Sequence, residues 1–450
     1  MNLYIDCTPT YLAPINTGIQ RVVRNILEHG SNAGIPLGIR VQPIFLIGRN
    51  GYRLYTADLK SATLEIRFRF WIKNQLSRFA DAMQYFVRKF THMSPGENGQ
   101  KPHWTKLMRL HLHRFAKQTY LKSSELFHLR RRVRFGKGDV LLLADASWNL
   151  NDWSGVQAAQ KTGARIGVLL YDLLPVTNPE WFDESLAESF QKWFDRVVDE
   201  AGFFLGISEA TISEFRRQVR QRKKRGTALP PSVSFPLGAD FQPLRAGQGS
   251  IRSRVKKIFP KNSPVPVYLA VGTLEPRKNH GYILDAFDRL WSRGGNASLC
   301  IVGRKGWKCE EVLSRLEKHP EAGKRLFAFH DLEDEELLYC YDRARALLIA
   351  SKNEGFGLPI IEALMRGLRV LASDIPVFRE VGSDFCTYFD LASPESLSKL
   401  IEREAQGVLP EPRPVSEFGW VTWKQSAEDL LEKIRRLNSS NPQGRRPTTA

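Results

Sequence analysis

Short apolar runs alternate with amphipathic helical patterns along most of this chain of 450 residues. Residues 140–144 and 166–171 are short apolar runs, as expected for buried strands of a parallel sheet. Residues 19–29 carry apolar side chains at three- and four-residue spacing, which predicts a helix, and we also expect a helix at 181–201. This alternation favours an α/β fold, and the length suits two or three domains of about 150 residues each.

The remaining elements continue the same pattern. Further strands are predicted at 3–6, 41–47, 203–206, 265–272, 299–303, 326–329, 344–350, 369–372 and 378–381. Further helices are predicted from Ser208, from Asn279, and at 358–366, 393–404 and 420–437, whereas 9–18 is expected to be a loop.

The stretch from Glu354 to Glu362 combines a strand end, a glycine turn and a helix start. Gly355 and Gly357 would let the backbone approach a ligand closely. The N–H groups and dipole at the start of the helix favour a phosphate, and both carboxylates could accept hydrogen bonds from sugar hydroxyls. In the alternative interpretation, Glu354 only complements the helix dipole and Glu362 is a solvated helix residue.

Seven residues separate Glu354 from Glu362, and Gly-Phe-Gly-Leu-Pro lies between them. This pattern resembles the E-x7-E motif of family 4 (group 1) glycosyltransferases of the bacterial polysaccharide and lipopolysaccharide type. The phrase GTLEPRKN, from Gly272 to Asn279, strengthens the resemblance. The resemblance covers most of 265–405 and implies a retaining enzyme of the GT-B fold, with two Rossmann-like domains facing a cleft.

The resemblance also suggests a division of the chain into five segments. We expect an acceptor domain, a linker, a nucleotide-sugar-binding domain, a segment with a helix that crosses back to the first domain, and a disordered tail. The expected bounds are 1–240, with a basic helical insert at about 56–137, then 241–264, 265–405, 406–437 and 438–450.

Four residues are the expected catalytic set. By resemblance, Arg277 and Lys278 would hold the diphosphate of the donor, Arg277 as a bidentate fork and Lys278 as a point charge. Glu354 would bind hydroxyls of the donor sugar. Stabilisation of the leaving diphosphate by the two cations needs no metal. Asp172 follows a predicted strand, and ligands in open α/β sheets bind at that end. Alternatively, Asp172 caps a loop, and Arg277 with Lys278 is a surface charge pair.

The other expected donor-binding residues are mostly glycines and their neighbours at strand ends and helix starts. They are Gly18, Gly272, Gly303, Leu332, Gly355, Phe356, Gly357, Leu358 and Glu362. By resemblance, Glu362 would hold ribose hydroxyls. The family usually has a Gly-Gly pair at the first position, whereas this chain has Thr17-Gly18. The match there is partial, and a simple strand–helix turn stays open.

The net charge of +18 is concentrated in two places. Residues 60–139 hold 18 Lys and Arg against 5 Asp and Glu, and the run 216–225 has seven positive residues in ten. The insert at about 56–137 combines basic and aromatic residues at helical spacing, which is typical of a helix on an anionic membrane surface. The alternative is a helical pair that packs on its own domain with a solvated basic face.

The spacing of the cysteines and the absence of long apolar runs suggest in which compartment the protein is found. Cys7, Cys300, Cys309, Cys340 and Cys386 show no paired spacing, which predicts reduced thiols and no metal site. We see no signal-peptide pattern and no run near about 18 apolar residues. We therefore expect a cytoplasmic location, including the inner face of the cytoplasmic membrane.

The predicted activity is transfer of a hexose from a nucleotide-sugar to a saccharide or lipid-linked saccharide in surface polysaccharide biosynthesis. Mannose is the expected sugar, the donor is GDP- or UDP-linked, and no further cofactor and no nucleic acid partner are expected. A nucleotide-sugar epimerase of the same fold is one alternative. The other is a non-catalytic scaffold that binds membrane or polyanions. A dinucleotide dehydrogenase is disfavoured because no G-x-G-x-x-G follows an early strand.

Overall fold

The computed structural model describes residues 1–12, 18–46, 51–54, 132–150, 152–223, 226–239, 251–261, 265–408 and 413–439. Its strands are β1 Asn2–Asp6, β2 Arg40–Leu46, β3 Tyr52–Leu54, β4 Val140–Leu143, β5 Arg165–Leu170, β6 Phe203–Gly206, β7 Ser232–Ser234, β8 Val267–Val271, β9 Ser298–Val302, β10 Leu326–Phe329, β11 Ala346–Ile349, β12 Val370–Ser373 and β13 Cys386–Phe389.

The helices fill most of the intervals between these strands. They are α1 Thr8–Leu12, α2 Gly18–Gly34, α5 Ser154–Lys161, α6 Leu174–Thr177, α7 Glu184–Glu200, α8 Glu209–Arg222, α9 Ser253–Ile258, α10 His280–Ser292, α11 Glu310–Lys318, α12 Asp334–Tyr341, α13 Leu358–Met365, α14 Pro376–Gly382, α15 Pro394–Ala405 and α16 Trp423–Ser439.

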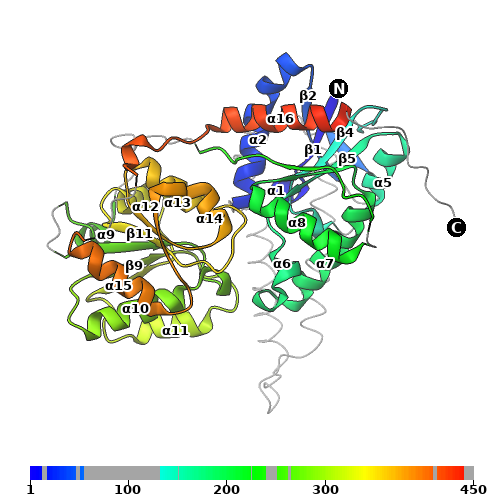
Figure 1. Ribbon diagram of the computed structural model, residues 1–450. Helices are drawn as coiled ribbons and strands as arrows, with labels where there is room; N and C mark the ends of the chain where they lie inside the picture. Colours follow the sequence, from blue (N-terminus) through cyan, green and yellow to red (C-terminus); the bar gives the residue numbers. More distant parts are fainter. Residues whose placement is uncertain are drawn as a thin grey trace, which may run out of the picture. The chain divides into compact units, whose positions relative to one another are not determined.

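Two sheets organise these elements (Figure 1). The strand order is β3-β2-β1-β4-β5-β6-β7 in the first sheet and β10-β9-β8-β11-β12-β13 in the second. Neighbouring strands of the second sheet all pair in parallel, whereas β3 joins the first sheet antiparallel to β2. Alternating strands and helices with parallel pairing make this an α/β structure, as the sequence predicts.

The chain divides into two compact units, Met1–Ile166 and Gly167–Ala450. In the second unit, α10, α11 and α15 cover one face of the six-stranded sheet, and α12, α13 and α14 lie on the other (Figure 1). The core under α10 and α15 contains fully buried aromatic and aliphatic side chains such as Tyr268 and Phe287. Strands covered on both faces are buried throughout, which is why they read as continuous apolar runs.

Most predicted elements are confirmed within one to three residues, and the predicted start of α8 is confirmed in detail. Ser208 is its N-cap, and its Oγ accepts a hydrogen bond from the Thr211 N–H at 3.1 Å. Ser393 caps α15 in the same way by accepting from the Glu395 N–H at 3.2 Å. Such caps satisfy N–H groups that the first turn of a helix leaves unpaired.

Two predicted elements are wrong. The expected loop at 9–18 overlaps α1, which begins at Thr8, and the Thr8 N–H donates to the Asp6 carboxylate at 2.9 Å. The expected strand at 378–381 lies inside α14, and Pro376 occupies the first turn of that helix, where proline is tolerated. The last strand of the sheet is β13 instead.

The C-terminal helix α16 packs against the segment that follows β7. Its Ser426 Oγ donates to the Pro236 carbonyl at 2.6 Å, and the indole of Trp420, just before the helix, donates to the Leu237 carbonyl at 2.7 Å. A Cβ on Gly238 would lie 2.3 Å from the Trp423 Cα, so only glycine fits there.

The domain bounds expected from the sequence stay predictions.

The basic segments differ in how much the structure describes. The insert expected at about 56–137 and the tail at 438–450 lie almost entirely outside the described residues, so both stay predictions. The second basic run falls largely on α8, where cations pair with acids of the same unit. These pairs are Arg216–Glu209, Arg217–Glu214, Arg222–Asp195 and Lys223–Asp199. Over the described chain, no helix is both long and apolar enough to span a bilayer.

Candidate functional site

The predicted strand–glycine–helix arrangement is present at the start of α13. Strand β11 ends at Ile349, and α13 begins at Leu358. Gly357 is the N-cap residue with a φ of +116°, a value that side chains rarely tolerate. Pro359 stands in the first turn, where its missing N–H costs nothing.

The structure brings Arg277 and Lys278 onto the carboxylate of Glu354. The two cations follow β8 in a short 3-10 turn, Pro276–Lys278, and each forms an ion pair with a Glu354 oxygen. Ser351 Oγ donates to the same carboxylate at 2.9 Å. The three charged side chains are mostly buried, with 8% of Glu354, 19% of Arg277 and 16% of Lys278 exposed. The interpretation of Arg277 and Lys278 as a surface pair is therefore wrong.

The ion pairs keep Glu354 ionised. Burial by itself would raise the pKa of Glu354, but Arg277 and Lys278 outweigh burial and hold that pKa at about 2. Burial opposes the charge of Arg277 too, yet Glu354, Glu275 and Asp172 together raise its pKa. For Lys278, burial wins and lowers the pKa, although Glu354 acts in the opposite direction. Lys278 is therefore the cation whose charge is held least firmly.

Asp172 lies beside this cluster. It follows β5, is half-buried, and accepts a hydrogen bond from the Leu174 N–H at 3.1 Å, so it also caps the following turn. Burial raises the pKa of Asp172, Arg277 opposes that rise, and the nearby Glu354 charge adds to it. The capping alternative thus describes a real contact, and it does not remove the carboxylate from the neighbourhood of the two cations.

Two of the predicted donor-binding glycines are required by contacts inside the protein. A Cβ on Gly303 would lie 1.8 Å from the carbonyl oxygen of Gly272. A Cβ on Gly355 would lie 2.0 Å from the carbonyl oxygen of Tyr171. Real Cβ atoms do not approach oxygen so closely, so these positions need glycine for packing, whatever role they have toward a ligand.

The remaining donor-binding predictions have the following places. Glu362 lies on α13 and accepts a hydrogen bond from the Tyr341 hydroxyl at 3.2 Å. Leu332 follows β10 and is half-buried, and the side chain of Phe356 is buried. Gly18 begins α2 in the first unit. The roles assigned to these residues stay predictions.

Several residues of the cluster were missed in the sequence. Glu275 is buried and pairs with Arg277 at 2.7 Å, so the two cations face two glutamates. His280 is 4% exposed at the start of α10, and burial, together with Lys278, lowers its pKa to about 4. Glu275 lies within the phrase GTLEPRKN and His280 directly follows it, so the phrase could have pointed to both. No comparable sequence motif pointed to Ser351.

The first unit has a second group of buried carboxylates. Asp6 ends β1 and Asp145 follows the neighbouring β4. Asp6 accepts hydrogen bonds from the Thr8 N–H at 2.9 Å and the Tyr52 hydroxyl at 3.0 Å. Asp145 accepts from the Thr10 N–H at 2.7 Å. These bonds fix the turns at the carboxyl edge of the sheet, and burial raises the pKa of Asp6 to about 6 in spite of them.

Asp6 should make stability depend on pH. Between its ordinary pKa of 3.8 and about 6, the folded protein binds a proton that the unfolded chain has released. The free energy of unfolding must therefore fall as pH rises through this window. In Asp6→Asn this contribution, about 3 kcal/mol, should be missing. Urea unfolding of the wild type, Asp6→Asn and the exposed control Asp183→Asn from pH 4 to 7 measures it, and equal slopes in all three would contradict it.

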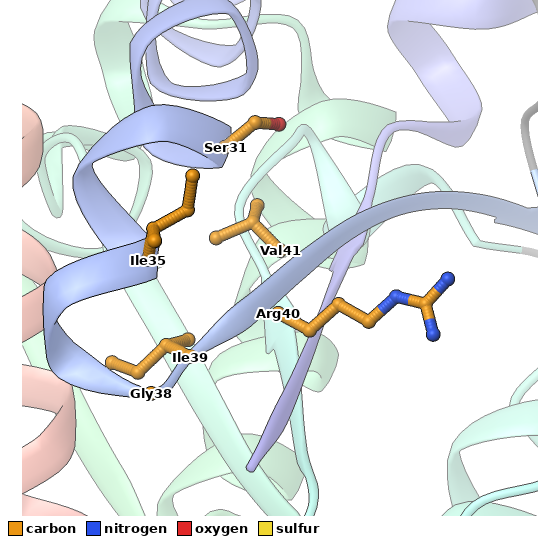
Figure 2. Close-up of a pocket in the computed structure, with 6 residues that line it drawn as sticks. All are labelled: Ser31, Ile35, Gly38, Ile39, Arg40 and Val41. Atoms are coloured by element: carbon orange, nitrogen blue, oxygen red, sulfur yellow. The ribbon is translucent and has the colours of Figure 1, made fainter.

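A surface pocket of about 360 Å³ lies at the other edge of the first unit (Figure 2). Its lining residues are Ser31, Ile35, Gly38, Ile39, Arg40 and Val41. Arg40 starts β2 and pairs with Asn2 at the start of β1, so the pocket lies at the amino ends of these strands. Because ligands in open α/β sheets bind at the carboxyl ends, we do not assign the donor to this pocket.

Metal ligands do not gather in the part of the chain that the structure describes. No three His, Cys, Asp or Glu side chains there are close enough together to hold a metal ion. What the described cluster offers is two cations, paired with glutamates, next to a helix start, an arrangement that suits a phosphorylated ligand able to compete for them.

Comparisons with known proteins agree with this chemistry. Residues 252–404 match the family model described as "Glycosyl transferases group 1". The chain is 32% identical over 437 residues to the "Serotype-specific mannosyltransferase WbdA" of Escherichia coli, an alignment that covers 96% of this chain and 46% of that protein. It is 32% identical over 215 residues to the "O-antigen chain mannosyltransferase B" of Escherichia coli, covering 48% of this chain and 54% of that protein.

The fold is similar to that of sucrose-phosphate synthase from Thermosynechococcus elongatus. The TM-score is 0.57 at 15% identity, and the alignment covers 98% of this chain and 100% of that one. At this identity the similarity concerns the fold alone, and it confirms the predicted GT-B fold. The chain spans about half the length of the curated relatives that it matches.

Proposed function

We propose, from the premise that this chain belongs to the group 1 glycosyltransferases, that it transfers mannose from a nucleotide-sugar to a saccharide in surface polysaccharide biosynthesis. The names of the two Escherichia coli relatives support mannose as the sugar, and the name of the second supports an O-antigen type of product. The acceptor is a saccharide or a lipid-linked saccharide.

The observation that carries this proposal is the pairing of Arg277 and Lys278 with Glu354 beside the start of α13. When a glycosidic bond to a diphosphate breaks, negative charge develops on the leaving phosphate. Two cations and the N–H groups of a helix start stabilise such a charge when they are already in place. The arrangement therefore suits loss of a nucleoside diphosphate from an activated sugar.

Glu354 has a second part in the proposal. In the unliganded protein its carboxylate forms ion pairs with both cations. A bound diphosphate competes for Arg277 and Lys278, and this competition frees carboxylate oxygens to accept hydrogen bonds from hydroxyls of the donor sugar. Glu362 is proposed to hold the ribose hydroxyls, and the diphosphate itself serves as the base that takes the proton of the acceptor hydroxyl. Transfer then proceeds with retention of configuration and without a metal ion.

Thermal unfolding with added nucleotides tests the donor site. GDP, UDP and ADP, each with its sugar conjugates, are added to the full chain. One of these nucleotides, with its sugar conjugates, should raise the melting temperature, because a ligand at about 100 times its Kd stabilises the folded state by about 2.7 kcal/mol. No shift with any of them would contradict the proposal.

A product assay with the stabilising nucleotide-sugar separates the activities. A transferase forms a glycoside only when the acceptor is present, whereas an epimerase converts the donor without it. We expect product only with a saccharide acceptor, and at an unchanged rate when a chelator is added. Donor conversion without acceptor would favour the epimerase, and binding without any turnover would favour the scaffold.

A further inference from the structure

Gly355 is held between two segments that precede it in the chain by more than 140 residues. Its backbone lies against the end of β5, where an added Cβ would meet the Tyr171 carbonyl oxygen at 2.0 Å and the Asp172 Cβ at 3.3 Å. Its own carbonyl oxygen faces the start of α8 and accepts a hydrogen bond from the Ser208 Oγ at 2.8 Å. The Gly355 peptide therefore has one close-packed side and one hydrogen-bonded side.

The hydroxyls of Ser208 and Thr211 form a short relay. Ser208 Oγ accepts from the Thr211 N–H at 3.1 Å, and its single hydrogen is within hydrogen-bond distance of two acceptors, the Gly355 carbonyl at 2.8 Å and Thr211 Oγ1 at 2.9 Å. Thr211 Oγ1 lies 3.2 Å from the same carbonyl and 3.4 Å from that of Tyr171, and its hydrogen satisfies one of them. Both side chains are buried, with 1% and 5% exposed, so water cannot replace these donors.

The start of α8 is itself fixed from the other side. The carboxylate of Glu380, on α14, accepts hydrogen bonds from the Glu209 N–H at 2.7 Å and the Ala210 N–H at 3.0 Å. Together with the Ser208 cap, three of the N–H groups at this helix start have partners. The two hydroxyls consequently stand on a rigid support rather than on a free helix end.

Holding the Gly355 carbonyl sets the direction of the next N–H group. In a trans peptide the C=O of one residue and the N–H of the following residue point in opposite directions. With the Gly355 C=O turned toward α8, the Phe356 N–H is turned away from α8, at the approach to the start of α13. The Phe356 ring is buried at the edge of the Trp420 ring, with centroids 5.9 Å apart, so side-chain packing also holds the residue that carries this N–H.

We propose that Ser208 and Thr211 are positioning residues for the donor, because they orient the Gly355–Phe356 peptide whose N–H binds the diphosphate. This inference rests on the proposed function, since it takes the start of α13 as the diphosphate site. Neither hydroxyl touches the donor. Their effect reaches it through one backbone peptide, so they influence donor affinity more than the chemistry at the sugar.

Four variants of the full chain test this role. Ser208→Ala removes the hydroxyl nearest to the Gly355 carbonyl, and Thr211→Val removes the second hydroxyl within reach of it while keeping the side-chain shape. Thr211→Ser restores the hydroxyl without the methyl group. Ser393→Ala is the matched control, because it removes the N-cap of α15 and has no contact with Gly355. Binding of GDP or UDP, whichever stabilises the wild type, is measured by calorimetry, and donor KM and kcat are measured with acceptor.

The expected result is a loss of donor binding that the control does not share. Ser208→Ala should weaken nucleotide binding roughly tenfold and Thr211→Val roughly threefold, with Thr211→Ser close to the wild type. Donor KM should rise by similar factors while kcat changes little. Ser393→Ala should lower the melting temperature and leave nucleotide affinity unchanged.

Two outcomes overturn the inference. If Ser208→Ala and Thr211→Val bind the nucleotide as the wild type does, the hydroxyls are structural only. If Ser393→Ala weakens binding as much as Ser208→Ala, the effect is one of general stability. Should Ser208→Ala not fold, the comparison of Thr211→Val with Thr211→Ser decides. A wild type that binds none of GDP, UDP and ADP would instead overturn the proposed function, and this inference with it.

Discussion

Replacing Glu354 with glutamine should lower kcat/KM for sugar transfer by at least about a hundredfold, the range seen when a preorganised electrostatic contact is removed. Glutamine has the same shape, but it carries no charge and presents an amide NH2 to Arg277 or Lys278. The donor sugar loses a carboxylate that accepts its hydrogen bonds, and the two cations lose the carboxylate with which both form ion pairs. Rates at saturating acceptor over a series of donor concentrations measure the loss.

The same variant should also be less stable. Glu354 is 8% exposed and pairs with two buried cations, so removing its charge leaves Lys278 without its ion-pair partner and Arg277 with Glu275 alone. Breaking a buried ion pair by removing one partner typically costs about 3–5 kcal/mol. Urea unfolding should show a reduced free energy of unfolding, and activity must be assayed at a temperature where the variant is folded.

Glu404→Gln separates the two effects. Glu404 is 2% exposed and pairs with Arg345 at 2.8 Å and the Tyr268 hydroxyl at 2.5 Å. These partners lie at the amino ends of β11 and β8, at the opposite edge of the sheet from Glu354. Glu404→Gln should lose stability and keep its kcat/KM. If folded Glu354→Gln turned over at the wild-type rate, the assignment of Glu354 to the site would be refuted.

The fold was predictable because its signals are local. Every residue of β4 and of β9 is buried, and an unbroken apolar run records this directly in the sequence. The two wrong elements have local signals that fit more than one structure. The first N–H of α1 is paired by Asp6, which looks like an ordinary strand end, and the apolar residues of α14 fit a strand as well as a helix.

The site was predictable only in part, because its contacts join distant segments. Resemblance identified Arg277, Lys278 and Glu354, but their mutual neutralisation depends on a fold that joins residues 77 positions apart. The hydrogen bond from Ser208 to Gly355 spans 147 positions. Ser208 is also a helix cap, and this local role fully accounts for a serine at that position. Sequence patterns therefore identified the charged groups of the site, but not the residues, such as Ser208, that hold the neighbouring backbone in place.

Lys278→Met should reduce transfer about as strongly as the change at Glu354, for a different reason. The stem of Lys278 lies against Gly272, where an added Cβ would be 3.4 Å from the Lys278 Cδ and Cε atoms. Methionine retains most of this apolar contact and removes only the ammonium group. A loss of roughly a hundredfold or more in kcat/KM is expected, since the ammonium stabilises the charge that develops on the leaving diphosphate.

The pH dependence gives this variant a second, independent readout. Burial lowers the pKa of Lys278, so in the wild type this lysine loses its proton at a lower pH than an exposed lysine does. Only the protonated form attracts a diphosphate, so donor affinity should fall as pH rises toward that lowered pKa. Lys278→Met has no such group, and its weaker affinity should stay level over the same alkaline range.

Lys352→Met is the matched control for charge. Lys352 is exposed two positions before Glu354, and its Nζ lies 5.9 Å from the centre of the Trp181 ring. It removes one positive charge from the same region without touching the Glu354 ion pairs. Its kcat/KM should stay within about twofold of the wild type, as expected of a screened surface charge. Equal losses in both lysine variants would mean that the overall positive charge of this region attracts the donor, and that Lys278 makes no specific contact with the diphosphate.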